Sequence, residues 1–266
     1  MDNRLSTALT IAGSDSGGGA GIQADLKTFQ AMGVFGTSAI TAVTAQNTGG
    51  VKEILVLSPE MVGSQIKAVM NDISPPAVKT GMLGAGAIIE VVARNMGQYN
   101  IELLVVDPVM VSTSGDRLMD PDAIGILKAC LLPLALVITP NLAEAEVLAG
   151  FPVNSRREME EAARAIREMG PRYVVVKGGH RDRDADDLVF DGDEMTYLRS
   201  PRLTEEKVHG TGCAFSAAIT AGLARGLSPN EAIVGAKDFI IKALTPPLNP
   251  GQGALVANIF NASEFK

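Results

Sequence analysis

The sequence contains no tryptophan, only two histidines and two cysteines, and few aromatic residues. Cys130 and Cys213 lie far apart and form no Cys-x-x-Cys pair, which excludes a disulfide framework and indicates a reducing compartment. His180 and His209 lack the spacing of a histidine-based metal site, and no His-Glu-x-x-His motif occurs. These absences leave metal chemistry, if any, to oxygen ligands.

Long apolar runs and positive charge are also scarce. The most apolar stretch, 129–138, falls well short of the roughly 20 residues that span a bilayer, and it is interrupted by Pro133. The first residues show no basic region followed by an apolar run, so we expect a cytoplasmic protein that contacts no membrane. The net charge of −7 argues against a nucleic-acid partner.

What the sequence does contain is a regular alternation of short apolar runs with helical patterns. The apolar runs predict strands over 8–12, 39–45, 51–57, 103–106, 134–138 and 173–176. A helix with Ile22, Leu26 and Phe29 on one stripe is predicted to end at Gly33, and helix starts are predicted at Ser58-Pro59 and at two Ser-x-x-Glu capping boxes, Ser155 and Ser228. The alternation predicts a three-layer α/β/α fold with a mainly parallel sheet. No linker or repeat interrupts it, so we expect one domain over 1–266, with a small meander in the polar segment 181–206.

Polar residues follow several of these strands immediately. Gly13, Gln46, Asp107, Asn141 and Lys177 each come at or just after the end of a predicted strand. In open parallel sheets, ligands bind beyond the carboxyl ends of the strands. The sequence therefore predicts a binding site that gathers these residues at one edge of the sheet.

The most informative segment is Lys207-Val-His-Gly-Thr-Gly-Cys213, which leads directly into a small-residue helical pattern. The first N–H groups of a helix have no internal partners, and glycines at 210 and 212 would let an anion approach them. With Thr211 between the glycines and Cys213 at the end, the turn predicts a phosphate site beside a nucleophile-type side chain. A tight turn with a buried structural cysteine is the alternative.

Two further groups of residues suit phosphoryl transfer. Asp107 and Glu144 offer the one or two carboxylates that Mg²⁺ usually takes from a protein, and Lys177 offers a point charge for a phosphate. Each has a simpler alternative: Asn141 and Glu144 could be a helix cap, and Lys177 a solvated lysine at a sheet edge.

The polar residues at the start of the chain point to an organic substrate. Asp25 lies on the apolar stripe formed by Ile22 and Phe29, either at its rim or aimed at a pocket. The Gln46 amide suits a heterocycle with adjacent amino and ring nitrogens, although it could simply support a turn. Met82 fits a core position equally well. We expect His209 to support the anion turn.

Common nucleotide and hydrolase motifs are missing. No Gly-x-x-x-x-Gly-Lys-Ser/Thr occurs, the triglycine at 17–19 does not complete Gly-x-Gly-x-x-Gly, and no Gly-x-Ser-x-Gly is present. A dinucleotide-dependent oxidoreductase and an α/β-hydrolase are therefore disfavoured, and nucleotide binding must use another arrangement.

The chain as a whole resembles the hydroxymethylpyrimidine kinase/phosphomethylpyrimidine kinase family of thiamine biosynthesis, within the ribokinase-like superfamily. The resemblance is carried by seven segments, 8–29, Thr44-Ala-Gln-Asn-Thr48, Lys79-Thr-Gly-Met-Leu83, Asp107-Pro-Val-Met110, Thr139-Pro-Asn-Leu-Ala-Glu144, Lys177-Gly-Gly-His180 and His209-Gly-Thr-Gly-Cys213. One departure is the C-terminal Asn249-Pro-Gly-Gln-Gly253, where similar chains carry a Gly-x-Gly-Pro element.

The resemblance implies ATP-dependent phosphorylation of 4-amino-5-hydroxymethyl-2-methylpyrimidine to the monophosphate and then the diphosphate. It implies a pyrimidine pocket, a Mg²⁺ site and an ATP-phosphate site, with Cys213 of the 210–213 turn as the catalytic base. The pocket residues would be Gly13, Asp25, Gln46 and Met82; Asp107 and Glu144 would organise Mg²⁺, and Asn141 and Lys177 would lie near the phosphates. A homodimer is also implied. The alternatives are a pyridoxal/pyridoxine kinase and a catalytically silent vitamin-precursor binding protein.

Overall fold

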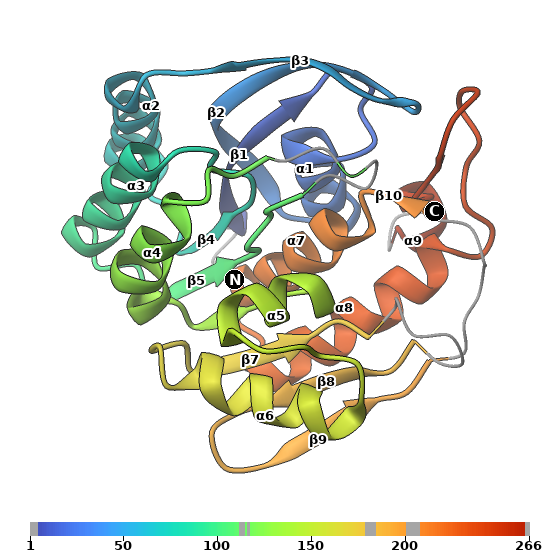
Figure 1. The fold of residues 1–266 in the computed structure, drawn as a ribbon. Coiled ribbons are helices and arrows are strands. Elements are labelled where there is room, and N and C mark those ends of the chain that lie inside the picture. The colour runs from blue at the N-terminus through green and yellow to red at the C-terminus, as the bar shows by residue number, and fades with distance from the viewer. Residues whose placement is uncertain (1–4, 112–114, 116–117, 179–184, 201–207, 264–266) are drawn as a thin grey trace.

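A nine-stranded, mainly parallel sheet forms the centre of the computed structural model, which describes residues 5–111, 115, 118–178, 185–200 and 208–263 (Figure 1). The strand order is β3-β2-β1-β4-β5-β6-β7-β8-β9. Pairing is parallel from β2 to β7 and antiparallel at both edges. The strands are β1 (Thr7–Asp15), β2 (Phe35–Asn47), β3 (Gly50–Val56), β4 (Ala77–Thr80), β5 (Leu103–Val106), β6 (Val137–Ile138), β7 (Tyr173–Val176), β8 (Asp187–Phe190) and β9 (Met195–Leu198).

Helices cover both faces of this sheet. One face packs on α1 (Gly21–Ala31), α7 (Thr211–Ala224), α8 (Pro229–Ala243) and the short α9 (Ile259–Ala262), around a core that includes Phe29, Val105 and Phe215. The other face packs on α2 (Pro59–Asp72), α3 (Gly86–Gln98), α4 (Ala123–Ile126), α5 (Leu142–Ala149) and α6 (Arg156–Arg167), around Ile66, Ile89 and Leu104. The predicted three-layer α/β/α architecture is confirmed.

The predicted helix starts are confirmed at their caps. The Ser58 side chain accepts a hydrogen bond from the Met61 N–H at the start of α2. Ser155 and Ser228 each form a reciprocal capping box with the glutamate three residues later, at α6 and α8. These local signals fix where the helices begin because they satisfy N–H groups that the helix itself leaves unpaired.

Other boundaries differ from the sequence prediction. The expected strand over 134–138 is only Val137–Ile138, because Leu132–Leu134 forms a 3₁₀ turn around Pro133, which has a fixed φ and no N–H to donate. Strand β4 and helix α3 were not predicted. Within the described part of 181–206, β8 and β9 form the expected meander, whereas His180 lies outside the described residues.

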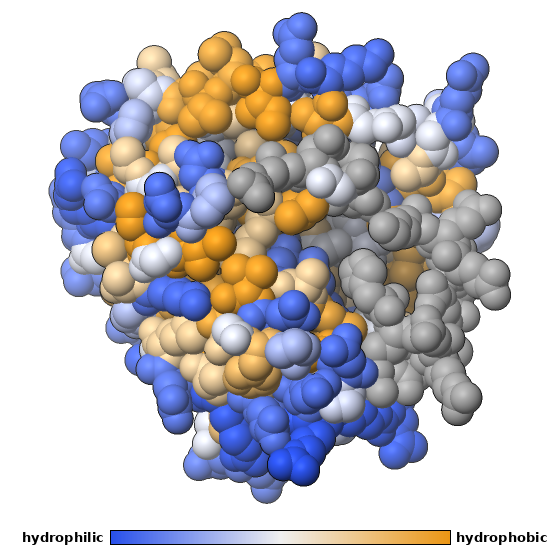
Figure 2. All heavy atoms as spheres, viewed as in Figure 1, coloured by the Kyte–Doolittle hydropathy of each residue, from blue (hydrophilic) through white to orange (hydrophobic). Residues whose placement is uncertain are grey.

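A further small sheet joins β10 (Val208–His209) to β11 (Leu255–Val256), near the start of α7. The outer face of the β2–β3 edge carries exposed apolar side chains, and Figure 2 shows hydrophobic residues gathered over this edge at the top of the view. In the described part of the chain, no helix combines the length and apolar character needed to cross a membrane.

Candidate active site

The predicted anion turn forms the N-terminus of α7. Gly210 is the N-cap residue with φ 78°, and a Cβ at this position would lie 1.8 Å from the Gly19 carbonyl oxygen, so only glycine fits. Among the described residues, no side chain caps this helix terminus. Thr211 donates its hydroxyl to the Val208 carbonyl oxygen at 2.9 Å, which leaves the first backbone N–H groups of α7 available to an anion.

A buried ion pair lies directly beside this turn. Lys177, which follows β7, donates from Nζ to Asp107 Oδ1 at 3.0 Å, and a Cβ on Gly212 would be 3.2 Å from the same Nζ. Asp107, which follows β5, also accepts from Thr139 (3.3 Å) and Ser216 (3.1 Å). The Lys177 side chain is only 16% exposed, so the alternative of a solvated edge lysine is wrong.

Both members of this pair are charged. Burial opposes the ionisation of Asp107, but Lys177 and Lys79 outweigh it and hold the pKa of the carboxyl below its usual value. Burial likewise opposes the charge on Lys177, but Asp107 and Glu144 hold the pKa of the ammonium above its usual value. The result is a fixed positive charge at the start of α7, where an incoming phosphate would meet it.

Asn141 and Glu144 cap the N-terminus of α5, as the simpler of the two sequence interpretations predicts. The Asn141 side chain accepts from the Glu144 N–H at 2.9 Å, and Glu144 Oε2 accepts from the Asn141 N–H at 2.8 Å. Burial raises the pKa of Glu144 to about 7, and the neighbouring charge of Asp107 adds to this effect. Asn141 also forms a parallel bridge with Lys177, so the cap lies next to the ion pair.

The donor set of Asp107 and Glu144 fits a magnesium ion that is also bound by phosphate. Two acidic groups near each other compete for a proton, and a divalent cation relieves that repulsion. Within the described residues, no cluster of three or more histidine, cysteine or acidic side chains could hold a metal by itself.

Asp25 is fully buried, so its placement at the rim of the apolar stripe is wrong. Its carboxylate accepts from Lys79 Nζ at 2.8 Å through both oxygens and from the Thr10 hydroxyl at 2.6 Å. Lys79 on β4 is itself fully buried. Burial opposes both charges: it raises the pKa of Asp25 in spite of Lys79 and Thr10, whereas Asp25 and Asp107 hold the pKa of Lys79 above its usual value. Contact of Asp25 with a substrate stays a prediction.

Cys213 lies where the N-termini of two helices meet. Its side chain is partly buried in the first turn of α7, and the Gly21 N–H at the start of α1 donates to its sulfur. Burial raises the pKa of the thiol to about 11, although the Lys79 ammonium pulls in the opposite direction. At neutral pH, the residue is therefore a thiol in the free protein.

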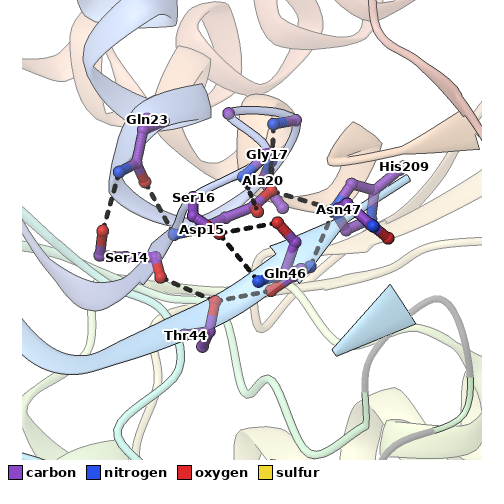
Figure 3. A network of polar contacts seen from close by, with 12 residues as sticks. Ser14, Asp15, Ser16, Gly17, Ala20, Gln23, Thr44, Gln46, Asn47 and His209 are labelled. Atoms are coloured by element: carbon purple, nitrogen blue, oxygen red, sulfur yellow. Dashed lines mark hydrogen bonds and ion pairs between the residues drawn. The ribbon is translucent and has the colours of Figure 1, made fainter. Parts of the chain in front are cut away.

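Of the other candidate pocket residues, Gly13 lies on β1, Gln46 on β2 and Met82 just after β4. A Cβ on Gly13 would lie 3.0 Å from the Met82 sulfur, so these two residues lie against each other. Gln46 on β2 is partly exposed and contacts His209 at 3.1 Å, directly before the anion turn (Figure 3). The structure thus brings Gln46 next to His209 and Lys177 next to Gly212, both at the start of α7.

The C-terminal turn lies on the same side as Gln46. The Gly253 N–H donates to the Thr48 hydroxyl at 3.1 Å, and the Ala254 N–H donates to the Thr48 carbonyl oxygen at 2.8 Å. Asn249 to Gly253, the departure noted in the sequence, therefore packs against the β2–β3 turn.

A doubly covered parallel sheet with an uncapped helix terminus, a buried lysine and a thiol at its carboxyl edge defines a ribokinase-like small-molecule kinase. The chain belongs to the phosphomethylpyrimidine kinase family, because the sequence pattern of that family matches residues 15–258. The resemblance found in the sequence is confirmed.

Individual relatives agree with this assignment. A hydroxymethylpyrimidine/phosphomethylpyrimidine kinase of Rhizobium meliloti is 50% identical, over 92% of this chain and 94% of its own. A crystal structure of phosphomethylpyrimidine kinase from Clostridium difficile is 44% identical, with a TM-score of 0.81 over 90% of this chain and 99% of that one. An ADP complex of Bacillus subtilis pyridoxal kinase is 38% identical, with a TM-score of 0.91 over 97% and 98%.

Proposed function

We propose that this protein transfers the γ-phosphoryl group of ATP to the hydroxymethyl oxygen of 4-amino-5-hydroxymethyl-2-methylpyrimidine, and then phosphorylates the monophosphate to the diphosphate. The observation that carries the proposal is the uncapped α7 terminus, with Lys177 on one side and Cys213 within its first turn. The relatives support the substrate, because several with this activity in their name match nearly the whole chain.

The transferred group would lie at the start of α7. Phosphoryl transfer is promoted mainly by positioning and by stabilising the negative charge that spreads over the oxygens. The backbone N–H groups at Gly212 and Cys213 and the Lys177 ammonium supply that stabilisation. Asp107 keeps Lys177 charged and oriented, and Ser216 and Thr139 in turn hold Asp107. Asn141 lies beside Lys177 and extends the phosphate site.

The Cys213 sulfur is assigned to accept the proton of the attacking alcohol. Because the pKa of the thiol is about 11, the thiolate is a minor species at neutral pH, about 10⁻⁴ of the free enzyme. A thiolate whose conjugate thiol has such a high pKa is a strong base. Burial maintains this basicity because water does not reach the sulfur to stabilise its negative charge. The second substrate needs no such base, since a phosphate monoester is largely dianionic above about pH 6.

Asp107 and Glu144 would hold Mg²⁺, which neutralises phosphate charge when it is bound. Gly13, Asp25, Gln46 and Met82 would hold the pyrimidine, with Gln46 reading the amino group and the neighbouring ring nitrogen. A homodimer, a cytoplasmic location and a single domain over 1–266 complete the proposal.

Pyridoxal is the second candidate substrate, because the pyridoxal kinase of Bacillus subtilis shares the fold at a TM-score of 0.91. An ADP-release assay with the pyrimidine alcohol, its monophosphate and pyridoxal tests both possibilities side by side. We expect both pyrimidines to be turned over with a much higher kcat/KM than pyridoxal. Turnover of pyridoxal alone would overturn the proposal, and absence of any turnover would favour a binding protein.

A further inference from the structure

Three polar side chains from distant parts of the sequence meet next to the anion turn (Figure 3). His209 Nε2 lies 3.2 Å from Asp15 Oδ2 and 3.1 Å from Gln46 Nε2. On its other side, the Gln46 amide lies 3.1 Å from the Thr44 hydroxyl. The contacts of this cluster determine which way the Gln46 amide points.

Asp15 is an ionised acceptor in this cluster. Its carboxylate receives backbone N–H groups from Gly17 at 2.8 Å, Gly19 at 3.0 Å and Ala20 at 2.8 Å. Burial opposes ionisation, but His209 and these N–H groups outweigh it and hold the pKa of Asp15 below its usual value. An ionised carboxylate can only accept hydrogen bonds. The His209 Nε2 that contacts it therefore carries a proton, whether the imidazole is neutral or charged.

A protonated His209 Nε2 cannot accept a hydrogen bond from the Gln46 NH₂ group that faces it. The oxygen and nitrogen of a glutamine amide are nearly isosteric, so their assignment follows from the hydrogen-bond network. With the amide turned by 180°, Gln46 Oε1 and Asp15 Oδ2 share the single Nε2–H of His209 in a three-centre hydrogen bond, and the NH₂ group donates to the Thr44 oxygen. The Thr44 hydroxyl can accept there because it donates its own proton to the Ser14 carbonyl oxygen at 2.9 Å.

We propose that His209, held by Asp15, is a positioning residue that locks the Gln46 amide with its oxygen toward the imidazole and its NH₂ group toward Thr44. In this orientation, Gln46 keeps one lone pair and one N–H for a ligand. These match a ring edge that carries an amino group beside an unprotonated ring nitrogen. The edge of a 4-oxo pyrimidine, a carbonyl beside a ring N–H, needs the opposite orientation of the amide.

The lock therefore selects the 4-amino over the 4-oxo ring, and this inference rests on the proposed function. Its test is the ratio of kcat/KM for 4-amino-5-hydroxymethyl-2-methylpyrimidine to kcat/KM for the 4-oxo analogue. The ratio is measured within each variant, so a loss of folded enzyme cancels. We expect the wild-type ratio to fall by about ten-fold or more in His209→Ala, because the freed amide can turn to fit the oxo ring.

His209→Gln is the matched control. A glutamine at 209 reaches about as far as His209 Nε2 and offers an N–H to both Asp15 and Gln46. We expect it to keep the wild-type ratio. If His209→Ala proves inactive, the ratio of the dissociation constants of the two rings, measured by calorimetry, replaces the kinetic ratio.

The outcomes separate the lock from the proposed function. If the wild-type enzyme phosphorylates neither pyrimidine, the proposed function is wrong, and so is the inference about His209 that rests on it. Wild-type enzyme that prefers the amino ring, with an unchanged ratio in His209→Ala, overturns the lock alone. An equal fall of the ratio in His209→Gln and His209→Ala also overturns it, because the effect would then not depend on the N–H donor.

Discussion

At the scale of single residues, the site contains two buried pairs of oppositely charged side chains. Lys177 pairs with Asp107 and Lys79 pairs with Asp25, and Cys213 lies within the electrostatic reach of both lysines. Paired charges can remain ionised in the protein interior, whereas a single buried charge is strongly destabilised by desolvation. The two lysines therefore supply fixed positive charge close to the thiol and the anion turn.

The role of Cys213 predicts a difference between the two phosphorylations. Cys213→Ala should lower kcat for the alcohol by about 10²-fold or more, the usual effect of losing a general base, and should lower kcat for the monophosphate far less. Steady-state rates with each substrate separately measure the difference. Equal losses in both reactions would contradict the assignment of the sulfur as the base.

The raised pKa of Cys213 predicts its reactivity. A thiol with a pKa near 11 gives about ten-fold more thiolate for each unit of pH between 7 and 10. In a Cys130→Ser background, which removes the exposed cysteine, the rate of alkylation by iodoacetamide should rise at this slope. An alkylation rate that levels off below pH 9 would show that the pKa of the Cys213 thiol is not raised.

The Asp25–Lys79 pair predicts a cost in stability. Asp25→Asn leaves the Lys79 ammonium unpaired in the core and should lower the free energy of unfolding by about 3–5 kcal/mol. Urea unfolding of Asp25→Asn, compared with the double variant Asp25→Leu/Lys79→Met, checks this. The double variant should recover most of the loss, since no charge is then stranded. An unchanged stability of Asp25→Asn would show that the pair is not ionised.

Asp25→Asn also tests the pocket assignment. If the carboxylate contacts the pyrimidine, KM for the pyrimidine rises while KM for ATP changes little. KM does not depend on the fraction of folded enzyme, so the result is independent of the stability loss. An unchanged KM for the pyrimidine would show that Asp25 does not contact the pyrimidine.

At the scale of elements, the helix starts were easier to predict than the short strands. Ser58, Ser155 and Ser228 act through contacts a few residues away, so the sequence alone reveals them. Strand β4 has four residues, and Pro75-Pro76 before it and Gly81 after it conceal its pattern. Lys79 was missed with this strand. The signal that could have found it is the pair of unexplained charges, Asp25 on an apolar helix stripe and Lys79 in a short apolar run.

The anion turn at the start of α7 gives a prediction at this scale. Gly210→Ala would place a Cβ against the Gly19 carbonyl oxygen and displace the turn, so kcat should fall by about 10²-fold or more. Gly226→Ala is the control, because Gly226 follows the other end of α7 with a similar φ of 86° and has open space around its Cβ position. Comparable activity loss in both variants would contradict a specific role for the turn.

At the scale of the whole molecule, the alternation of apolar runs and helical patterns predicted the three layers and the parallel sheet. It could not reveal which side chains meet across the sheet. The contacts of Gln46 with His209 and of Asp107 with Lys177 join residues that are 163 and 70 positions apart. Such contacts depend on strand order, which the local pattern does not encode.

The exposed apolar edge predicts the oligomeric state. Large side chains are exposed at Val43 on β2, at Ile54, Leu55 and Val56 on β3, and at Met61 in α2, and Figure 2 shows hydrophobic residues gathered over the β2–β3 edge. An exposed apolar patch is typical of surfaces that contact another protein. We expect a dimer that Leu55→Asp dissociates and that Val234→Asp, at an exposed position of α8, leaves intact. Light scattering after gel filtration checks this, and a monomeric wild-type protein would contradict it.

The most direct test of the account is a crystal structure of the enzyme with the pyrimidine alcohol and a non-hydrolysable ATP analogue. We predict the γ-phosphate within about 3.5 Å of the backbone N–H groups at Gly212 and Cys213, with the alcohol oxygen between it and the Cys213 sulfur. A phosphate bound elsewhere, or a sulfur that faces away from the alcohol, would contradict the account.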